Sequence, residues 1–425
     1  MRRIAFHTLG CKVNQYDTQA MLESFQQAGW QVCGFDEHAD AYVVNTCTVT
    51  GTGDKKSVQI IRRVHRENPD AAIVVTGCLA QRDPDRVLLP GVKLILGTAQ
   101  RARVVELLER AIKQNECLIE VRSLKGAPFE PLIVHSHEGK TRATMKIQEG
   151  CDRYCTYCVI PYVRGPVRSM ELSAVISEAE RLAQTGYREI VVTGIHLTSY
   201  GRGTEYELCD ALEAIGRIVG VERIRLGSLE PYYVSEERAE RLSRMPKLCR
   251  QFHLSMQSGS AGVLSRMHRR YTPEEYAHAV ELLRKYMPGC AITTDVLTGF
   301  PGETVEEAQE TLDFVRKIGF ARIHVFPYSR RSGTVADKLP DQVPESVKHA
   351  RATELIALGN ELSAEYEKSM LGSVHDVLLE EEVGEGLCEG YTREYLRVRA
   401  KGTPGEIVNL RLTEMDGNVI IGVRE

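Results

Sequence analysis

The sequence has no apolar run of the length that crosses a lipid bilayer. Its first residues, Met1-Arg2-Arg3, lead directly into a predicted strand, without the apolar core of a secretion signal. We therefore expect a cytoplasmic protein that does not associate with membranes. In that compartment, 12 cysteines among 425 residues indicate metal or redox chemistry rather than disulfide bonds.

The sequence also lacks the excess of positive charge that is typical of nucleic-acid-binding proteins, because its formal net charge is −4. Its 43% hydrophobic and 26% charged residues describe an ordinary globular protein, and its length predicts two or three domains. Each short basic run is more often a solvated face, so only convergence in space would indicate a binding surface. These runs are 62–66, 101–103, 266–270 and 330–331.

Three thiols lie close together in the middle of the chain, at Cys151, Cys155 and Cys158. A zinc site usually takes four ligands, and no fourth ligand is evident nearby. A cubane iron–sulfur cluster held by three thiolates leaves one iron open, which fits a set of three. The preceding segment 141–148 alternates like a strand, and Tyr157 places an aromatic ring beside the last cysteine. A structural zinc site and three ordinary buried thiols are the alternatives.

A second set of three cysteines is spread over the amino-terminal part of the chain. Cys11, Cys47 and Cys78 each follow a predicted strand directly. In an open parallel sheet, the loops at the carboxyl ends of the strands gather at one crevice. We therefore expect these thiols to meet in a second three-thiolate site, although any one of them alone fits a buried core residue. The remaining cysteines are interpreted as core or incidental: Cys33, Cys117, Cys209, Cys249, Cys290 and Cys388.

Strands and helices alternate through most of the chain, which predicts an α/β protein in three parts. Residues 1–115 predict a doubly wound parallel sheet, 116–140 an interdomain connection, and 141–370 an incomplete barrel of six strand–helix units. Residues 371–425 predict a small antiparallel β-barrel, with a glycine-bearing turn at 384–390. Strands are expected at 3–9, 41–46, 71–76, 93–96, 142–147, 189–193, 223–227, 251–255, 291–297, 322–326, 375–381, 395–399, 407–412 and 419–423. Helices are expected at 17–28, 55–67, 103–113 and 344–370.

The spacing of Cys151, Cys155 and Cys158 is the signature of the radical S-adenosylmethionine (SAM) superfamily. The resemblance implies a [4Fe-4S] cluster that binds SAM and cleaves it to a 5′-deoxyadenosyl radical. The three parts in this order, with segments 8–17 and 150–161, resemble the methylthiotransferase family, in which an amino-terminal cluster domain precedes a radical SAM barrel and an RNA-binding TRAM domain. Within the family, 10–14 and 195–201 resemble the branch that modifies N6-threonylcarbamoyladenosine at position 37 of tRNA.

The resemblance implies two [4Fe-4S] clusters and two SAM molecules per turnover. One SAM methylates a sulfur at the cluster of the first cysteine set, and the other supplies the radical that takes hydrogen from C2 of the adenine. An unactivated aromatic C–H bond has no useful acid–base route at neutral pH, which agrees with the lack of an evident His/Asp constellation. The expected SAM contacts lie beside the last cysteine and at the ends of barrel strands: Tyr157, Gly194, Ser228, Glu230 and Gln257.

The partners that the resemblance implies are a tRNA anticodon loop, a sulfur donor, and an electron donor of the flavodoxin or ferredoxin type. The TRAM segment 372–425 has six Lys/Arg against eleven Asp/Glu, so RNA contact would depend on one face. A barrel that only packs on the enzyme is the alternative. The isopentenyladenosine and ribosomal-protein S12 branches are alternative functions, and a non-enzymatic iron–sulfur or zinc RNA-binding protein is one of another class. The expected RNA contacts are Arg393, Arg397, Arg399 and Lys401.

Overall fold

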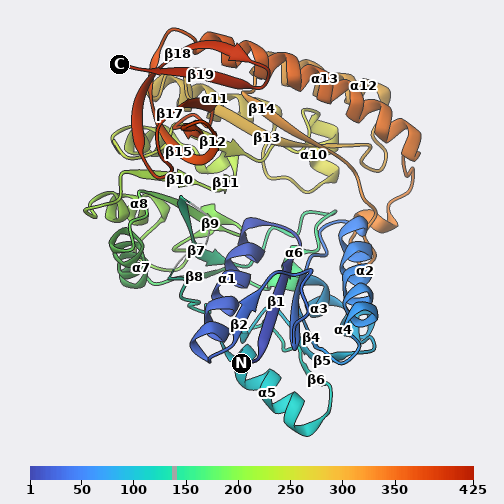
Figure 1. Cartoon of the computed structure of the whole chain (residues 1–425). Helices are drawn as coiled ribbons and strands as arrows, with labels where there is room; N and C mark the ends of the chain where they lie inside the picture. Colours follow the sequence, from blue (N-terminus) through green and yellow to red (C-terminus); the bar gives the residue numbers. More distant parts are fainter. Residues whose placement is uncertain (136–140) are drawn as a thin grey trace.

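The amino-terminal part is a three-layer α/β unit, drawn in blue and cyan in Figure 1. Its parallel sheet has the order β2-β1-β3-β4-β5-β6. Apolar side chains of α1 and α5 form the core on one face, and those of α2, α3 and α4 form the core on the other. The strands are β1 (Arg3–Thr8), β2 (Gln31–Cys33), β3 (Ala41–Thr46), β4 (Ala72–Gly77), β5 (Val92–Leu96) and β6 (Leu118–Glu120). The helices are α1 (Lys12–Gln27), α2 (Gly51–Glu67), α3 (Cys78–Arg82), α4 (Pro84–Val87) and α5 (Val104–Gln114), with the short η1 (Arg101–Arg103).

The central part is the incomplete barrel that the sequence predicts. Its parallel strands form two sheets, β10-β9-β7 with the short antiparallel β8, and β11-β12-β13-β14, and a bridge between Ile224 and Leu248 connects them. The strands are β7 (Arg142–Glu149), β8 (Arg168–Ser169), β9 (Glu189–Gly194), β10 (Arg223–Leu226), β11 (Ser228–Leu229), β12 (Gln251–Leu254), β13 (Ala291–Thr298) and β14 (Arg322–Pro327). The helices are α6 (Ile160–Arg164), α7 (Leu172–Gln184), α8 (Leu208–Gly216), α9 (Glu236–Ser243), α10 (Ala261–Arg266), α11 (Pro273–Tyr286), α12 (Val305–Ile318) and α13 (Glu345–Ser369).

Capping and strand alternation explain the regularity of this part. Thr272 and Thr304 each cap a helix and complete a capping box with the glutamate three residues later. Along β7, Ala143, Met145 and Ile147 face the helices, so Arg142, Lys146 and Gln148 face the barrel interior. The interior of the barrel is therefore polar and charged.

The carboxyl-terminal part is a closed five-stranded barrel with the order β15-β16-β17-β19-β18. It differs from the prediction in two respects. β17 and β19 pair in parallel, and most of the expected turn at 384–390 belongs to a strand. Gly390 is in that strand because an added Cβ would lie 2.0 Å from the carbonyl oxygen of Leu378. The strands are β15 (Val374–Gly384), β16 (Leu387–Thr392), β17 (Arg397–Lys401), β18 (Ile407–Asp416) and β19 (Val419–Arg424).

The structure describes residues 1–135 and 141–425, so part of the expected connection, 136–140, lies outside the described residues. The strand β6 falls within the expected connection. Helix α1 begins at Lys12, five residues before the expected start at Asp17. Among the described residues, none of the helices is both long enough and apolar enough to cross a membrane.

Both flanking parts contact the central barrel. Helix α1 packs against β7 and β9. On the carboxyl-terminal side, Arg223 donates to the carbonyl of Tyr391 at 3.0 Å, and Arg225 donates to those of Thr392 and Arg393 at 3.1 and 2.9 Å. Both arginines belong to the short strand β10, which begins at Arg223. The small barrel therefore covers the amino-terminal end of this strand (Figure 1).

Candidate active site between two cysteine triads

The amino-terminal triad consists of Cys11, Cys47 and Cys78, which follow the neighbouring strands β1, β3 and β4. Cys11 is the N-cap of α1 and is exposed, Cys47 is half-buried, and Cys78 is the buried first residue of α3. Gly10 lies against Cys47, since an added Cβ would approach its Sγ to 3.0 Å. Burial raises the pKa of Cys78 to about 11, and the neighbouring thiols Cys11 and Cys47 act in the same direction.

The barrel triad lies in the loop between β7 and α6. The amide of Cys158 donates to the carbonyl of Cys155 at 2.9 Å, and that of Cys151 donates to the carbonyl of Gly165 at 3.0 Å. Burial, reinforced by the neighbouring thiols, raises the pKa of Cys158 to about 12. Thr156 attaches the loop to the end of α10, because its hydroxyl donates to the carbonyl of Arg266 at 2.9 Å.

Each triad offers three thiols, the number that a cubane cluster with one open iron takes. In the described ranges, no group of three Cys, His, Asp or Glu side chains converges as the ligands of one metal ion do. The thiolates of a cubane bind different irons and therefore stand farther apart. A glycine lies next to each triad. Gly10 lies beside Cys47. Gly150 precedes Cys151 and has φ +77°, and an added Cβ at this position would meet the carbonyl oxygen of Pro166.

A buried network of five charged side chains joins the two triads. The Lys146 ammonium contacts the Asp17 carboxylate at 2.5 Å and that of Glu149 at 3.0 Å. Arg101 pairs with the same two carboxylates, as does Arg164. Burial alone would raise the pKa of Asp17 and of Glu149, but the surrounding cations outweigh it and hold both pKa values below their usual range.

Of the predicted SAM contacts, Tyr157 lies in the loop of the barrel triad, and the other four lie at or just after the carboxyl ends of barrel strands. Tyr157 packs with Val263 and Met267. Gly194 ends β9, where an added Cβ would lie 2.8 Å from the Cβ of Gln148. Ser228 is exposed. Gln257 has φ +68°, and its amide donates to the carbonyl of Asp295 in β13. Glu230, the fifth predicted contact, accepts a hydrogen bond from Arg269.

A buried histidine, His196, lies beside Glu230. The Nε2 atom of His196 lies 4.0 Å from Glu230 Oε1 and 3.1 Å from the hydroxyl of Tyr232. Burial lowers the pKa of His196 to about 3, and the adjacent Arg153 acts in the same direction, so the ring is neutral near pH 7. Arg153 stacks on Tyr232 at 4.6 Å. Arg153 and Tyr232 line one wall of a cavity of about 370 Å³.

Sequence reasoning missed the arginines of the site, because it read basic runs as solvated faces. Arg269 is buried and its Nη1 lies 3.4 Å from Cys155 Sγ. Arg101 belongs to the buried network. Arg331 is buried against Asp54 of α2 at 2.8 Å. The signal that sequence alone offered for Arg164 was weak, since its partners are far apart along the chain.

The predicted RNA contacts lie on the small barrel and differ in their partners. Arg393 pairs with Asp376 at 2.8 Å and donates to the carbonyl of Pro246 at 2.5 Å, so it helps to hold the small barrel to the central one. Arg397 and Arg399 both pair with Glu389, at 2.5 and 2.7 Å. Lys401 is exposed at the end of β17.

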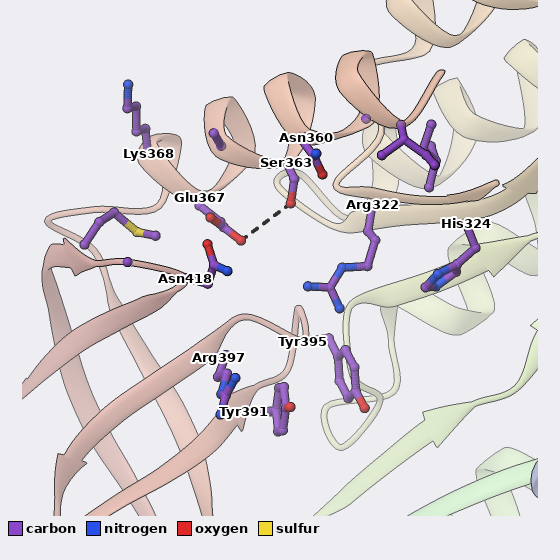
Figure 2. Close-up of a pocket in the computed structure, with 16 residues that line it drawn as sticks. Arg322, His324, Asn360, Ser363, Glu367, Lys368, Tyr391, Tyr395, Arg397 and Asn418 are labelled. Atoms are coloured by element: carbon purple, nitrogen blue, oxygen red, sulfur yellow. Dashed lines mark hydrogen bonds between the residues drawn. The ribbon is translucent and has the colours of Figure 1, made fainter. Parts of the chain in front are cut away.

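A cavity of about 930 Å³ lies where the small barrel meets α13 and β14 (Figure 2). Figure 2 shows the guanidinium of Arg322 pointing into it, between Asn418 and Tyr395. Tyr391 and Tyr395 stack with ring centroids 4.5 Å apart. Arg397, one of the predicted RNA contacts, belongs to the lining. The cavity thus combines cations with aromatic rings.

Two family models match the chain. Residues 3–97 match the model described as uncharacterized protein family UPF0004, and residues 145–315 match that of the radical SAM superfamily. The chain is 43% identical over 423 residues to threonylcarbamoyladenosine tRNA methylthiotransferase MtaB of Bacillus subtilis, covering 97% of this chain and 94% of that one. It belongs to the radical SAM methylthiotransferase family.

A relative that acts on another modified adenosine has a lower identity to this chain. The tRNA-2-methylthio-N(6)-dimethylallyladenosine synthase of Clostridium novyi is 34% identical over 435 residues, covering 99% of this chain and 96% of that one. Among solved structures, the radical SAM methyltransferase TsrM of Kitasatospora setae has a TM-score of 0.58 at 17% identity, covering 76% of this chain and 73% of that one. That likeness concerns the fold. Membership of the radical SAM superfamily implies a [4Fe-4S] cluster and SAM.

Proposed function

We propose that this protein adds a methylthio group to C2 of N6-threonylcarbamoyladenosine at position 37 of tRNA, using two [4Fe-4S] clusters and two SAM molecules per turnover. The main support is the 43% identity to a threonylcarbamoyladenosine tRNA methylthiotransferase over nearly the full length of both chains. The chemistry also requires a sulfur donor and an electron donor of the flavodoxin or ferredoxin type. Because its substrate is tRNA, we place the enzyme in the cytoplasm.

The six cysteines would hold the clusters, Cys151, Cys155 and Cys158 the radical-generating one, and Cys11, Cys47 and Cys78 the one that carries sulfur. When bound, the barrel cluster would supply the electron that cleaves SAM to a primary radical, and the amino-terminal cluster would offer an open iron for the sulfur. Cys11 is the exposed member of its triad, which leaves that side of the second site accessible.

The side chains around the barrel triad would orient SAM. Arg269 bridges the triad and the predicted SAM contact Glu230, since it contacts Cys155 Sγ at 3.4 Å and donates to Glu230. Its charge keeps the carboxylate of Glu230 in place to accept hydrogen bonds from ribose hydroxyls. The neutral His196 and the hydroxyl of Tyr232 offer further polar contacts. Tyr157 of the triad loop packs against the apolar cluster that includes Val263 of α10.

The cavity between the small barrel and α13 supports the RNA part of the proposal. Proteins bind single-stranded RNA by combining cations for the phosphates with aromatic rings for the bases. The cavity has both, in Arg322, Lys368 and Arg397 and in the stacked Tyr391 and Tyr395. Among the ion pairs of the described residues Arg322 has none, although the Glu367 carboxylate in the same lining interacts with its charge.

The decisive experiment analyses the nucleosides of tRNA by mass spectrometry after reaction with anaerobically reconstituted enzyme. We expect the 2-methylthio derivative of N6-threonylcarbamoyladenosine with wild type, and none with Cys78→Ala or Cys158→Ala. Cys33→Ala is the matched control, because Cys33 belongs to the same amino-terminal sheet but to neither triad. Iron analysis should give about eight irons per chain, falling by half when either triad is replaced.

A second candidate substrate is tRNA that carries dimethylallyladenosine, as the relative from Clostridium novyi favours. A competition between the two tRNAs decides between them. Faster product formation on the dimethylallyl tRNA would replace our proposal. Absence of SAM binding at equilibrium would instead indicate a non-enzymatic RNA-binding protein, and methylthiolation of ribosomal protein S12 alone would indicate a protein substrate.

A further inference from the structure

Arg164, the last residue of α6, contacts the amino-terminal triad through its side chain, and the residue that follows it contacts the barrel triad. Its Nε donates to the Sγ of Cys78 at 3.3 Å. The next residue, Gly165, accepts the amide of Cys151 at 3.0 Å through its carbonyl. A single turn of backbone therefore lies between a ligand of the amino-terminal cluster and a ligand of the barrel cluster.

The rest of the Arg164 guanidinium is held by three further groups. Its Nη1 contacts Asp17 Oδ2 at 2.9 Å and Glu149 Oε1 at 3.0 Å, and its Nη2 donates to Asn14 Oδ1. Asp17 and Asn14 are on α1 of the amino-terminal part, whereas Glu149 ends β7 of the barrel. The side chain of Arg164 is 1% exposed, so water does not share these contacts.

The five most deeply buried side chains of this network carry one more positive charge than negative charges. Arg101, Lys146 and Arg164 bring three positive charges, and Asp17 and Glu149 bring two negative ones, with all five side chains at most 3% exposed. Glu130 pairs with Arg101 from the rim at 3.1 Å and is more accessible to water. A cysteine that binds iron is a thiolate, and a buried guanidinium 3.3 Å away stabilises that charge.

We propose that Arg164 is a positioning residue that donates an N–H···S hydrogen bond to the iron-bound Cys78 and thereby sets the reduction potential of the amino-terminal cluster. The inference rests on the proposed function, because it takes Cys78 as a cluster ligand. Hydrogen bonds and positive charge at a ligand sulfur stabilise the more negative, reduced state of a cluster and raise its potential. The same side chain contacts Glu149 at the end of β7, and the backbone that follows it reaches Cys151 through the carbonyl of Gly165.

The test uses the Cys151/Cys155/Cys158→Ala protein, in which only the amino-terminal triad remains to bind a cluster. In this background we compare Arg164→Lys with Arg101→Lys. Lysine keeps the charge that Asp17 and Glu149 need but removes the Nε donor. Arg101 is the matched control, because it pairs with the same two carboxylates but has no recorded contact with Cys78. Circular dichroism and iron analysis verify folding and loading, and a redox titration followed by EPR gives the midpoint potential.

We expect Arg164→Lys to retain about four irons and to shift the midpoint potential downward by at least the equivalent of a tenfold change in the ratio of reduced to oxidised cluster, 59 mV for one electron. The EPR line shape of Arg164→Lys should also change, whereas Arg101→Lys should change neither the midpoint potential nor the line shape. Equal shifts in the two variants, or none in Arg164→Lys, would overturn the proposal. Loss of iron from folded Arg164→Lys but not from Arg101→Lys would also support the contact with Cys78. If the background protein itself binds no iron, the proposed function fails rather than the role of Arg164.

Discussion

Replacing Glu189 by glutamine should loosen the joint between the central barrel and the small barrel. Glu189 starts β9 and is fully buried, where it pairs with Arg223 at 2.8 Å and with Arg225 at 2.7 Å. Those two arginines donate to backbone carbonyls of Tyr391, Thr392 and Arg393. Glutamine keeps the shape of the side chain but leaves two buried cations without their anion.

The size of the effect follows from the pKa of Glu189. Burial alone would raise it, but Arg225 and Arg223 lower it from 4.5 to about 2. A depression of that size corresponds to about 3 kcal/mol of stability at neutral pH, since a tenfold change in an ionisation constant is worth about 1.4 kcal/mol. Removing one partner of a buried ion pair costs a similar amount, about 3–5 kcal/mol. We expect Glu189→Gln to lower the free energy of unfolding by about 3 kcal/mol at pH 7.

The assay is urea unfolding of the metal-free protein, followed by circular dichroism, with Glu222→Gln as the control. Glu222 pairs with Arg188 at 3.2 Å on the surface, where both side chains are more than 40% exposed, so its loss should cost less than about 1 kcal/mol. Because the pKa of Glu189 is depressed on folding, its contribution is complete above pH 4.5 and is lost as the pH falls toward 2. Glu189→Gln and Glu222→Gln unfolding at the same urea concentration at pH 7 would refute this reasoning.

Gly10→Ala should reduce the iron bound at the amino-terminal triad and leave the barrel triad loaded, because Gly10 has φ +104° and an added Cβ would crowd Cys47. The check is iron analysis of Gly10→Ala in two proteins, the Cys151/Cys155/Cys158→Ala protein and the protein with all its cysteines. Full iron in both would contradict it. Arg322→Ala should weaken binding of an anticodon stem-loop and reduce the slope of log affinity against log salt by about 0.7, the value for one phosphate contact on single-stranded RNA. Arg397→Ala should have the smaller effect, since Arg397 already pairs with Glu389, and an unchanged salt slope for Arg322→Ala would remove the cavity from the RNA-binding surface.

The order and bounds of the main strands could be predicted from the sequence because each is a short apolar or alternating run between turn signals. The predicted barrel strand 291–297, for example, is observed as Ala291–Thr298. The edge strand β2 was missed because it has only three residues, and β16 because its glycines resemble a turn. Gly390 is required by a neighbouring strand that sequence alone does not place beside it.

The two cysteine triads could also be proposed from the sequence, since one is a compact motif and the other recurs after successive parallel strands. The side chains that surround them could not. Arg269 precedes Arg270 in a basic run, yet it is buried against Cys155 while Arg270 is exposed. Local composition does not distinguish a solvated arginine from one that a distant carboxylate and thiol hold in the interior, because the partner is supplied by the tertiary fold.

The amino-terminal motif gains a physical meaning from the helix that begins within it. Cys11 caps α1, and Asn14 and Asp17 follow at intervals of three residues, so the three side chains lie along one face of the helix. Asn14 donates to the carbonyls of Leu9 at 2.7 Å and Thr46 at 3.0 Å, which ties the loops that precede Cys11 and Cys47. Asn14 and Asp17 also accept hydrogen bonds from Arg164 of the barrel. One helical face thus carries the proposed cluster ligand Cys11 together with the contacts that fix it relative to the barrel, and a shift in helical register would lose both at once.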